Sequence, residues 1–478
     1  MRATKIVATL GPAVDSYESI VRLIQAGMNV ARLNFSHGDH AEHARRIELV
    51  RRAAAELGQP VAILQDLAGP KMRTGEHLHD EPLVLKAGQQ FTLTTDDVLG
   101  TSERVSTTYK ALPQDVHPAD RILLSDGRIA LEVLEKTATE VICRVCNGGV
   151  LRPKQGINLP GVNISAPSVT RKDIADLEFG LAHDVDYVAI SFVRRAGDVE
   201  QVKKLIAGAG RNVPVIAKIE RPEALAVLND ILDVADGVMV ARGDLGVEIP
   251  LEQVPLIQKH IIAAANRRAV PVITATQMLE SMINDPSPTR AEVSDIANAI
   301  LDGSDAVMLS GETSIGQYPV EAVQTMAAIA AAVETSGTLP PHSHTDSTDW
   351  VLHEVQTIPQ AIGTAVSAIT KALAVNAIWV FTQSGRTARQ VSHYRPAVPI
   401  IALTPYDHIY RRLALLWGVQ PLKSDYYEDD LEFWQQIIPT VIQSGYARPG
   451  DTVVITGGHP FNQHGPTNFL KIMQIGQE

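Results

Sequence analysis

PVIAKIERPEALAVLNDILDVADGVMVARGDL, residues 214–245, contains two short apolar runs on either side of a helical stretch. The runs are PVIAKIE (214–220) and GVMVARGDL (237–245), and charged residues stand near the end of each. Strands that alternate with helices are typical of βα units, because a parallel crossover has to pass through a helix-sized connection. This stretch therefore predicts an α/β fold with parallel strands.

The same unit recurs along the chain. Apolar runs of strand length alternate with amphipathic segments such as AEHARRIELVRRAAAELG (41–58). Eight successive βα units predict a closed (β/α)8 TIM barrel. The six further runs are TKIVATLG (4–11), VARLNFSH (30–37), VAILQDL (61–67), YVAISFV (187–193), PVITATQM (271–278) and AVMLSGE (306–312).

About a hundred residues with a different pattern, short alternating strands without intervening helices, interrupt the barrel after its third strand. FTLTTDDV, RILLSDGRIALEVL and EVICRVCNGGV alternate like antiparallel strands, with tight turns expected at Asp126-Gly127 and Asn147-Gly148. We expect an inserted small β-barrel lid domain here. Cys143 and Cys146 are three apart on such a strand and should point to opposite faces, and no second pair completes a zinc site.

A third unit follows the eighth run. TSGTLPPHSHTDSTDW (335–350) is polar and contains prolines, so it is interpreted as a linker. Beyond it, NAIWVFTQSG, VPIIALTP, VQPLKS and DTVVITGG alternate with helical segments and predict a C-terminal α/β regulatory domain. The expected domains are 1–69 with 169–338, 70–168, and 350–478.

Bulk properties narrow the class of protein. The chain has 478 residues, 45% hydrophobic residues and a formal net charge of −12. That charge argues against nucleic acid or an anionic membrane as a partner. The sequence has no signal-peptide pattern and no apolar stretch of about 18 residues, so a cytoplasmic location is expected.

Polar residues gather at the predicted strand ends, where barrel enzymes place their chemistry. Lys218 and Glu220 share one side of a strand, and Asp244 follows the neighbouring strand. Two carboxylates with open positions suit Mg2+ (or Mn2+), and a lysine beside the ion faces whatever the ion binds. A metal with a lysine stabilises a developing enolate or a transferring phosphoryl group.

Other residues near the strand ends could bind the substrate. Arg32 and Arg73 suit phosphate, and Thr276 is expected to open a helix after strand seven.

Two other classes remain open from these residues alone. Barrel aldolases use a strand-end lysine as a Schiff base, but that lysine needs a low pKa, whereas Glu220 and Asp244 should keep Lys218 charged. A catalytically silent metabolite sensor on the same fold is the other alternative, because fold alone does not assign activity.

The chain resembles the pyruvate kinase family over essentially its whole length. The motifs are TKIVATLGP, MNVARLNFSHG, GINLPG, VIAKIER, VMVARGDLGVEIP, TATQMLESM, PTRAEVSDIANAILDGSDAVMLSGET and GPTNFLKI. The resemblance implies transfer of a phosphoryl group from phosphoenolpyruvate to ADP, giving pyruvate and ATP, by an allosteric homotetramer. It also implies roles for the residues that match. These are metal binding by Glu220 and Asp244, transition-state stabilisation by Lys218, phosphoenolpyruvate binding by Arg32, Gly243, Asp244 and Thr276, nucleotide contact by Arg73, His37 and Lys154, and proton relay by Ser310 and Glu312.

The resemblance implies a potassium site at Asn34, Ser36 and Asp66, but the chain departs from the family beside it. Lys71 stands where many members have glutamate, and Leu67 stands where many have threonine. Two cations at close range would repel by several kcal/mol at an effective dielectric of about 20. We therefore expect the Lys71 ammonium to replace K+, so that activity does not require potassium.

A second departure concerns the nucleotide segment, where Gln155 stands in place of the usual lysine and Lys154 lies one residue earlier. In the C-terminal domain, TQSGRTARQ (382–390) resembles the family's effector loop, in which a glycine before a helix start favours phosphate. The second effector loop (456–468) lacks the tryptophan of many members that respond to fructose 1,6-bisphosphate. We therefore expect a small phosphorylated effector, a sugar monophosphate or AMP, at Thr382, Ser384, Gly385, Arg386 and Thr387.

Overall fold

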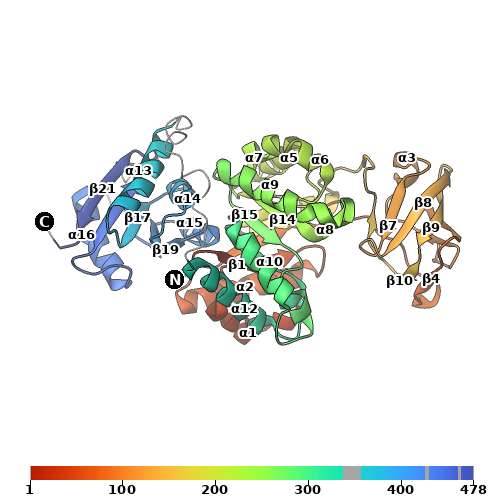
Figure 1. Ribbon diagram of the computed structural model, residues 1–478, viewed down its shortest axis with the longest axis horizontal. Coiled ribbons are helices and arrows are strands. Elements are labelled where there is room, and N and C mark those ends of the chain that lie inside the picture. The colour runs from red at the N-terminus through yellow and green to blue at the C-terminus, as the bar shows by residue number, and fades with distance from the viewer. Residues whose placement is uncertain (1, 337–356, 426–429, 461–464, 477–478) are drawn as a thin grey trace.

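The computed structural model describes residues 2–336, 357–425, 430–460 and 465–476. The predicted linker, 335–350, lies outside these residues beyond Ser336. The barrel stands in the middle of the molecule, with the inserted β domain at one end and the C-terminal α/β domain at the other (Figure 1).

Eight parallel strands close the barrel in the order β1-β16-β15-β14-β13-β12-β3-β2, which confirms the predicted (β/α)8 fold. Every run named from the sequence contains one of them. The strands are β1 (Lys5–Thr9), β2 (Val30–Asn34), β3 (Ala62–Asp66), β12 (Tyr187–Ile190), β13 (Val215–Ile219), β14 (Gly237–Ala241), β15 (Val272–Ala275) and β16 (Ala306–Leu309).

The helices around the barrel begin at polar caps and end at turns that the sequence marks. Thr289 and Glu292 form a reciprocal capping box at one helix start, and Gly58 ends another helix at φ 61°, where a β-carbon is disfavoured. The helices are α1 (Tyr17–Ala26), α2 (His40–Leu57), α4 (Arg171–Ala182), α5 (Ala196–Gly208), α6 (Pro222–Ala226), α7 (Leu228–Val234), α8 (Arg242–Glu248), α9 (Val254–Arg267), α10 (Arg290–Leu301), α11 (Gly311–Ser314) and α12 (Pro319–Thr335), with 3-10 turns η1 (Pro12–Val14), η3 (Leu251–Gln253) and η4 (Glu280–Ile283).

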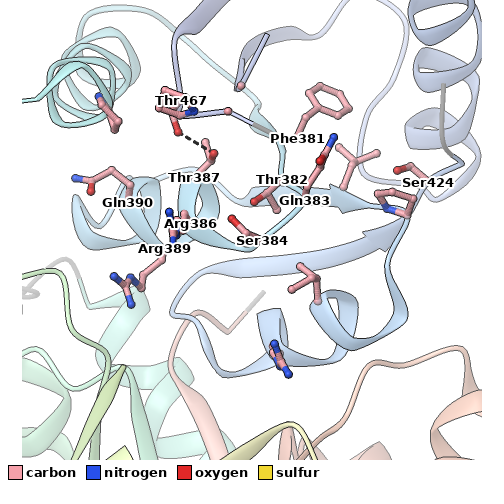
Figure 2. A pocket seen from close by; sticks show the side chains of 18 of the residues that line it. Phe381, Thr382, Gln383, Ser384, Arg386, Thr387, Arg389, Gln390, Ser424 and Thr467 are labelled. Atoms are coloured by element: carbon pink, nitrogen blue, oxygen red, sulfur yellow. Dashed lines mark hydrogen bonds between the residues drawn. The ribbon is translucent and has the colours of Figure 1, made fainter. Parts of the chain in front are cut away.

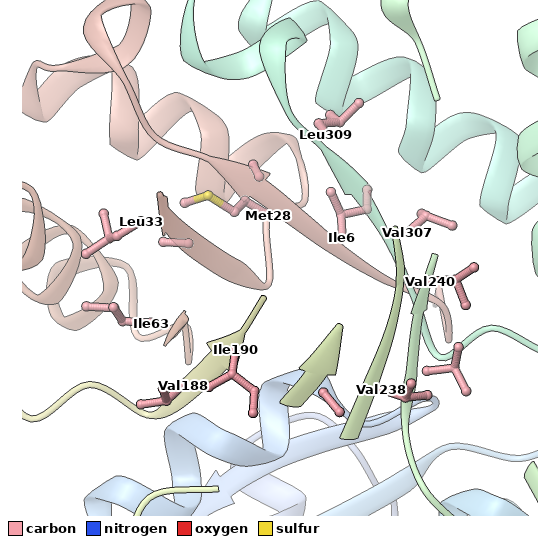
Figure 3. Packing of buried hydrophobic residues seen from close by; sticks show 14 of the residues in the cluster. Ile6, Met28, Leu33, Ile63, Val188, Ile190, Val238, Val240, Val307 and Leu309 are labelled. Carbon is pink, nitrogen blue, oxygen red and sulfur yellow. The ribbon is translucent and has the colours of Figure 1, made fainter. Parts of the chain in front are cut away.

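Each barrel strand buries both faces. One face packs on the helices through residues such as Ile6, Leu33 and Val240 (Figure 3). The opposite face fills the barrel with a second cluster that includes Val7, Met239 and one residue of the C-terminal domain, Leu415. Burial on both faces is typical of parallel sheets. It leaves polar side chains room mainly at the strand ends.

The inserted segment is a small β domain. Its six-stranded sheet has the order β11-β7-β8-β9-β5-β6, and isolated bridges Arg73↔Gly156 and Thr74↔Thr107 link the segment after β3 to both edges. The strands are β5 (Gln90–Thr94), β6 (Arg104–Ser106), β7 (Arg121–Leu124), β8 (Ile129–Lys136), β9 (Glu140–Asn147) and β11 (Ile157–Asn158), with a separate pair β4 (Leu83–Leu85) and β10 (Gly149–Leu151), helix α3 (Leu112–Asp115) and 3-10 turn η2 (Leu78–Asp80).

Two lid predictions meet different outcomes. Asp126-Gly127 lies in the β7–β8 hairpin turn, with φ of 56° and 83°, as expected. The hairpin predicted at Asn147-Gly148 is wrong, because β10 crosses to pair with β4; a β-carbon on Gly148 would lie 2.3 Å from the carbonyl oxygen of Leu85. Cys143 is buried and Cys146 exposed on opposite faces of β9, and burial raises the pKa of the Cys143 thiol to about 12.

The C-terminal domain has a five-stranded sheet, β19-β18-β17-β20-β21, in which only β21 is antiparallel. Four of these strands were predicted, and the edge strand β21 was not. The elements are β17 (Ala377–Phe381), β18 (Ile400–Thr404), β19 (Val419–Lys423), β20 (Thr452–Gly457), β21 (Phe469–Gln474), α13 (Ile358–Ala372), α14 (Arg386–His393), α15 (Asp407–Arg412), η5 (Leu413–Leu415) and α16 (Asp430–Gln443).

Candidate functional site

Lys218 lies at the end of β13 and is the centre of a buried ionic cluster. Its Nζ lies 2.8 Å from Oε1 of Glu220 and 3.3 Å from Oδ1 of Asp66, and it donates to Oγ of Ser191 at 2.7 Å. Burial works against the charge of the Lys218 ammonium, but Asp66, Glu220 and Asp244 outweigh it and raise the Lys218 pKa. Lys218 is therefore held cationic, which disfavours the Schiff-base alternative.

Arg32 faces the same cluster from β2. Its Nε and Nη2 each lie 2.7 Å from Oδ2 of Asp66, and its Nη1 donates to Oγ1 of Thr9 at 2.9 Å. Burial of Asp66 opposes its ionisation, yet Lys218 and Arg32 together lower the Asp66 pKa. The cluster thus places two fixed cations, Lys218 and Arg32, at the strand ends, and these suit an anionic substrate.

The proposed metal ligands, Glu220 and Asp244, follow neighbouring parallel strands, as expected. Both Glu220 oxygens have partners, since Oε1 contacts Lys218 and Oε2 accepts from the Phe192 amide at 2.9 Å. Burial, opposed by Lys218 and assisted by the Asp244 carboxylate, raises the Glu220 pKa. A divalent ion between the two carboxylates would relieve this repulsion, so the pair fits a metal.

The number of protein ligands is small. In the part of the chain that the structure describes, no three or more His, Cys, Asp or Glu side chains are grouped so that they could together hold a metal ion. Two carboxylates with free coordination positions are typical of magnesium sites that bind substrate oxygens directly.

Thr276 and Gly243 contact each other across β14 and β15. The Gly243 amide donates to Oγ1 of Thr276 at 2.7 Å, and Thr276 has φ of 68°. Thr276 was expected to open a helix, and this is wrong: η4 begins at Glu280, after a left-handed turn at Thr276 and Gln277. Arg242 holds the turn by donating from Nη2 to the Thr276 carbonyl at 2.7 Å.

Ser310 and Glu312 follow β16. Glu312 is fully buried, and its two oxygens accept from the amides of Leu279, at 2.9 Å, and Ser310, at 2.6 Å. Its carboxylate therefore joins the ends of β15 and β16. This geometry suits support of the Ser310 peptide more than direct contact with a substrate.

The monovalent-cation region also comes together. Asn34 is paired in register with Asp66, and its Oδ1 accepts from the Ser36 amide at 3.1 Å. Lys71 is exposed as a whole residue, yet partial burial of its ammonium, followed by the charge of Lys218, lowers its pKa, while Asp244, Asp66 and Glu220 oppose the shift. The Lys71 ammonium therefore interacts electrostatically with Lys218 and with the carboxylates of the cluster.

The residues expected to contact nucleotide are less closely grouped. Arg73 and Lys154 line one cavity of about 650 Å3 in the inserted domain, where Lys154 forms an ion pair of 2.5 Å with Glu76. His37 is exposed in the loop after β2. Partial burial of its imidazole lowers the His37 pKa, and the charges of Lys71, Arg73 and Arg32 lower it further.

The predicted effector loop borders a second cavity of about 800 Å3 (Figure 2). Ser384 and Arg386 are exposed. Thr387 is buried and shares a hydrogen bond of 2.8 Å with Thr467, and Oγ1 of Thr382 accepts from the Gly385 amide at 2.8 Å. Two cationic residues that the sequence did not single out, Arg389 and Arg412, also line this cavity, together with His408, whose pKa is lowered by partial burial and by the charges of Arg412 and Arg411.

Two further residues of the barrel site were missed. Ser191 and Thr9 hold Lys218 and Arg32 through the hydrogen bonds given above. Thr9 ends β1 and Ser191 directly follows β12, and both lie in the second half of a predicted run, TKIVATLG or YVAISFV, so their position was a usable signal.

Comparisons with known proteins agree with this geometry. The family model for the pyruvate kinase barrel domain matches residues 1–323, and that for the pyruvate kinase alpha/beta domain matches residues 360–473. Pyruvate kinase from Geobacillus stearothermophilus is 49% identical over 478 residues, covering 99% of this chain and 80% of the relative. Pyruvate kinase 2 from Synechocystis is 50% identical over 474 residues, covering 98% and 79%.

The fold comparison is equally extensive. A crystal structure of a pyruvate kinase from Cryptosporidium parvum superimposes with a TM-score of 0.89 at 35% identity, over 99% of this chain and 96% of that one. Both domain models, the full-length relatives and the fold therefore agree: the chain belongs to the pyruvate kinase family.

Proposed function

We propose that this chain transfers the phosphoryl group of phosphoenolpyruvate to ADP, giving pyruvate and ATP in the last step of glycolysis. The observation that carries the proposal is the buried lysine at the end of β13, held cationic by Asp66, Glu220 and Asp244. A fixed positive charge stabilises both a phosphoryl group in transfer and the enolate that remains.

The neighbouring residues have roles that follow from their charge. Arg32 binds the substrate phosphate, and Thr276 with the Gly243 amide binds its carboxylate end. Glu220 and Asp244 hold Mg2+ or Mn2+, which supplies positive charge to substrate oxygens when bound. Ser310, supported by Glu312, helps to deliver a proton to the enolate carbon.

Lys71 takes the place of a monovalent cation in this proposal. Its pKa responds to Lys218, Asp66, Glu220 and Asp244, which supports an ammonium close to the phosphoryl position beside Asn34 and Ser36. Arg73, His37 and Lys154 contact the nucleotide when the lid domain approaches the barrel.

Regulation is proposed for the C-terminal domain. The cavity bordered by Thr382, Ser384, Arg386 and Thr387, with Gly385 in the same loop, takes a sugar monophosphate or AMP, because Arg389 and Arg412 add positive charge to its wall. Effector binding shifts a homotetramer between two states.

Two surface observations bear on assembly and location. Leu251 and Leu256, on η3 and α9 of the barrel, are 74% and 68% exposed, which supports a subunit contact there. None of the described helices is long and apolar enough to cross a membrane. A cytoplasmic location is proposed from the family.

A direct assay of ATP formation from phosphoenolpyruvate and ADP tests the proposal. We expect activity with Mg2+ or Mn2+ and none after chelation. Glu220→Ala and Asp244→Ala should each weaken metal binding, measured by titration with Mn2+, as well as activity. An unmodified, folded protein that makes no ATP under these conditions refutes the proposed function.

A further inference from the structure

Residues 34–37, the end of β2 and the start of the loop after it, contact α2 and α4, two helices to which the proposed mechanism assigns no residue. Asn34 and Ser36 lie on this loop. Phe35 turns the other way, into the hydrophobic core between the barrel and these helices, and is 1% exposed. The contacts to Phe35 and His37 therefore decide how the loop is presented.

His43 of α2 holds the loop through both its ring and its proton. The imidazole stacks on the Phe35 ring, with centroids 4.0 Å apart and planes 14° apart, and it is 2% exposed. Its Nε2 lies 3.0 Å from the carbonyl oxygen of His37. A carbonyl only accepts, so Nε2 carries the proton, while the buried Nδ1 has no hydrogen-bond partner among the described atoms.

Lys172 of α4 holds the same loop two residues earlier. Its Nζ donates to the Phe35 carbonyl at 2.8 Å and lies 2.5 Å from Oδ2 of Asp176. Asp176 is itself nearly buried, and its Oδ1 lies 2.8 Å from Nε2 of His40. The Lys172 ammonium is thus oriented by a fixed carboxylate and by one main-chain oxygen.

The first turn of α4 also reaches the loop after β3. Oδ1 of Asp173 accepts from the Gly69 amide at 3.0 Å, two residues before Lys71. The Asp176 carbonyl accepts from Nε2 of Gln65, the residue before Asp66, at 2.6 Å. One helical turn therefore holds both loops that supply the monovalent-cation region.

We propose that His43 and Lys172 are positioning residues for phosphoryl transfer, which fix the carbonyls of Phe35 and His37, the residues on either side of Ser36, so that Asn34 and Ser36 face Asp66. The proposal rests on the proposed function. Neither residue touches a reacting atom. Their effect comes through placement, and a shift of about 1 Å in a positioning element is enough to slow an enzyme on the order of 10²-fold.

Paired variants separate the hydrogen bond from the ring. His43→Phe keeps a stacking ring but loses the donor, whereas His43→Gln keeps an N–H donor at a similar reach. Lys172→Met removes the ammonium, whereas Lys172→Arg keeps a donor. We expect kcat to fall about tenfold or more in His43→Phe and Lys172→Met, with KM for phosphoenolpyruvate within about twofold. His43→Gln and Lys172→Arg should recover most of the loss.

His183→Phe is the matched control. His183 also stacks on a phenylalanine, Phe179, at 4.1 Å, and bonds that residue's carbonyl at 2.9 Å. Phe179 makes a tilted contact with Phe35 at 5.9 Å, so His183 is separated from the loop by one ring. The kcat of His183→Phe should equal that of the unmodified chain. The midpoints of thermal unfolding should be similar in all the variants.

Unchanged kcat in a folded His43→Phe overturns the inference. If His43→Phe does not fold, the test is made on Lys172, whose side chain is exposed. Unchanged kcat in Lys172→Met then also overturns the inference. An unmodified chain without phosphoenolpyruvate-dependent ATP formation would instead refute the proposed function.

Discussion

Nζ of Lys218 lies 2.8 Å from Oε1 of Glu220, so the lysine already contacts the carboxylate that we propose as a metal ligand. Two positive charges would then share one carboxylate. Mutual repulsion between the ammonium and a divalent ion weakens metal binding in the free protein but concentrates positive charge where the phosphoryl group reacts. Loss of Lys218 should therefore slow phosphoryl transfer without weakening metal binding, whereas loss of Glu220 should weaken metal binding.

The Lys71 ammonium predicts independence from potassium. ATP formation by the unmodified chain, in buffer with an organic counter-ion and no K+ or Na+, should match the rate with added KCl. Lys71→Glu should lower the rate about tenfold or more without K+, because it exchanges a positive for a negative charge beside Asp66, and KCl should restore part of it. Lys86→Glu, on an exposed lysine of the inserted domain, is the control. A strong potassium requirement in the unmodified chain contradicts the proposal.

Asp186 is expected to stabilise the contact between the barrel and the C-terminal domain. It is fully buried and lies 2.8 Å from both Arg51 and Arg411. Asp186→Asn should lower the free energy of unfolding by about 2–3 kcal/mol, since it leaves two partly buried guanidinium groups without their counter-charge. Urea denaturation measures this loss.

Asp184→Asn provides the comparison for Asp186. The Asp184 side chain is 65% exposed and lies 3.0 Å from Arg211, so its removal should cost less than about 1 kcal/mol. Equal losses in the two variants would show that burial of Asp186 does not matter.

Lys5 should make stability depend on alkaline pH. Burial, followed by the charge of Arg2, lowers the Lys5 pKa from 10.5 to about 7, although Glu334 opposes the shift. The unfolded chain binds this proton more tightly, so the free energy of unfolding should rise between about pH 7 and 10.5 by at most ~1.4 kcal/mol per pH unit. Below pH 7 both states are charged and this dependence ends.

Lys5→Met should flatten that part of the pH profile, whereas Lys86→Met should not. Urea denaturation at pH 6, 8 and 9 provides the comparison. Because Nζ of Lys5 also donates to the Val419 carbonyl at 2.7 Å, part of the gain from removing the buried amine will be offset. A pH slope that is the same in Lys5→Met and in the unmodified chain assigns the dependence to another group.

The effector cavity predicts a selective loss of activation. Ser384 is exposed at the cavity, so Ser384→Asp should repel a phosphate and abolish activation by a sugar monophosphate or AMP while basal kcat stays the same. Ser444→Asp, beyond the end of α16, is the control. Activation by fructose 1,6-bisphosphate alone in an effector screen would show that the ligand was chosen wrongly.

The strand pattern predicted most of what places the site. Arg32, Asp66, Lys218 and Glu220 each stand near the end of an apolar run, and closure of the barrel brings those ends together. The apolar strand faces that pack on the helices and the polar residues at the strand ends both follow from periodicity and β-branched content. These are local properties of the sequence.

What sequence did not predict depends on contacts between distant segments. The left-handed backbone of Thr276 is held by Arg242, and the barrel interior is completed by Leu415 from another domain. The edge strand β21 pairs on one side only, and its sequence, FLKIMQ, lacks strict alternation. None of these follows from spacing along the chain.

Steady-state kinetics of Lys218→Met, combined with Mn2+ titration of the free protein, test the central claim most directly. We predict that kcat falls about 10²-fold or more, that KM for phosphoenolpyruvate changes little, and that Mn2+ binds as tightly as before or more tightly. Near-normal kcat in a folded Lys218→Met would contradict the assignment of phosphoryl transfer to this lysine.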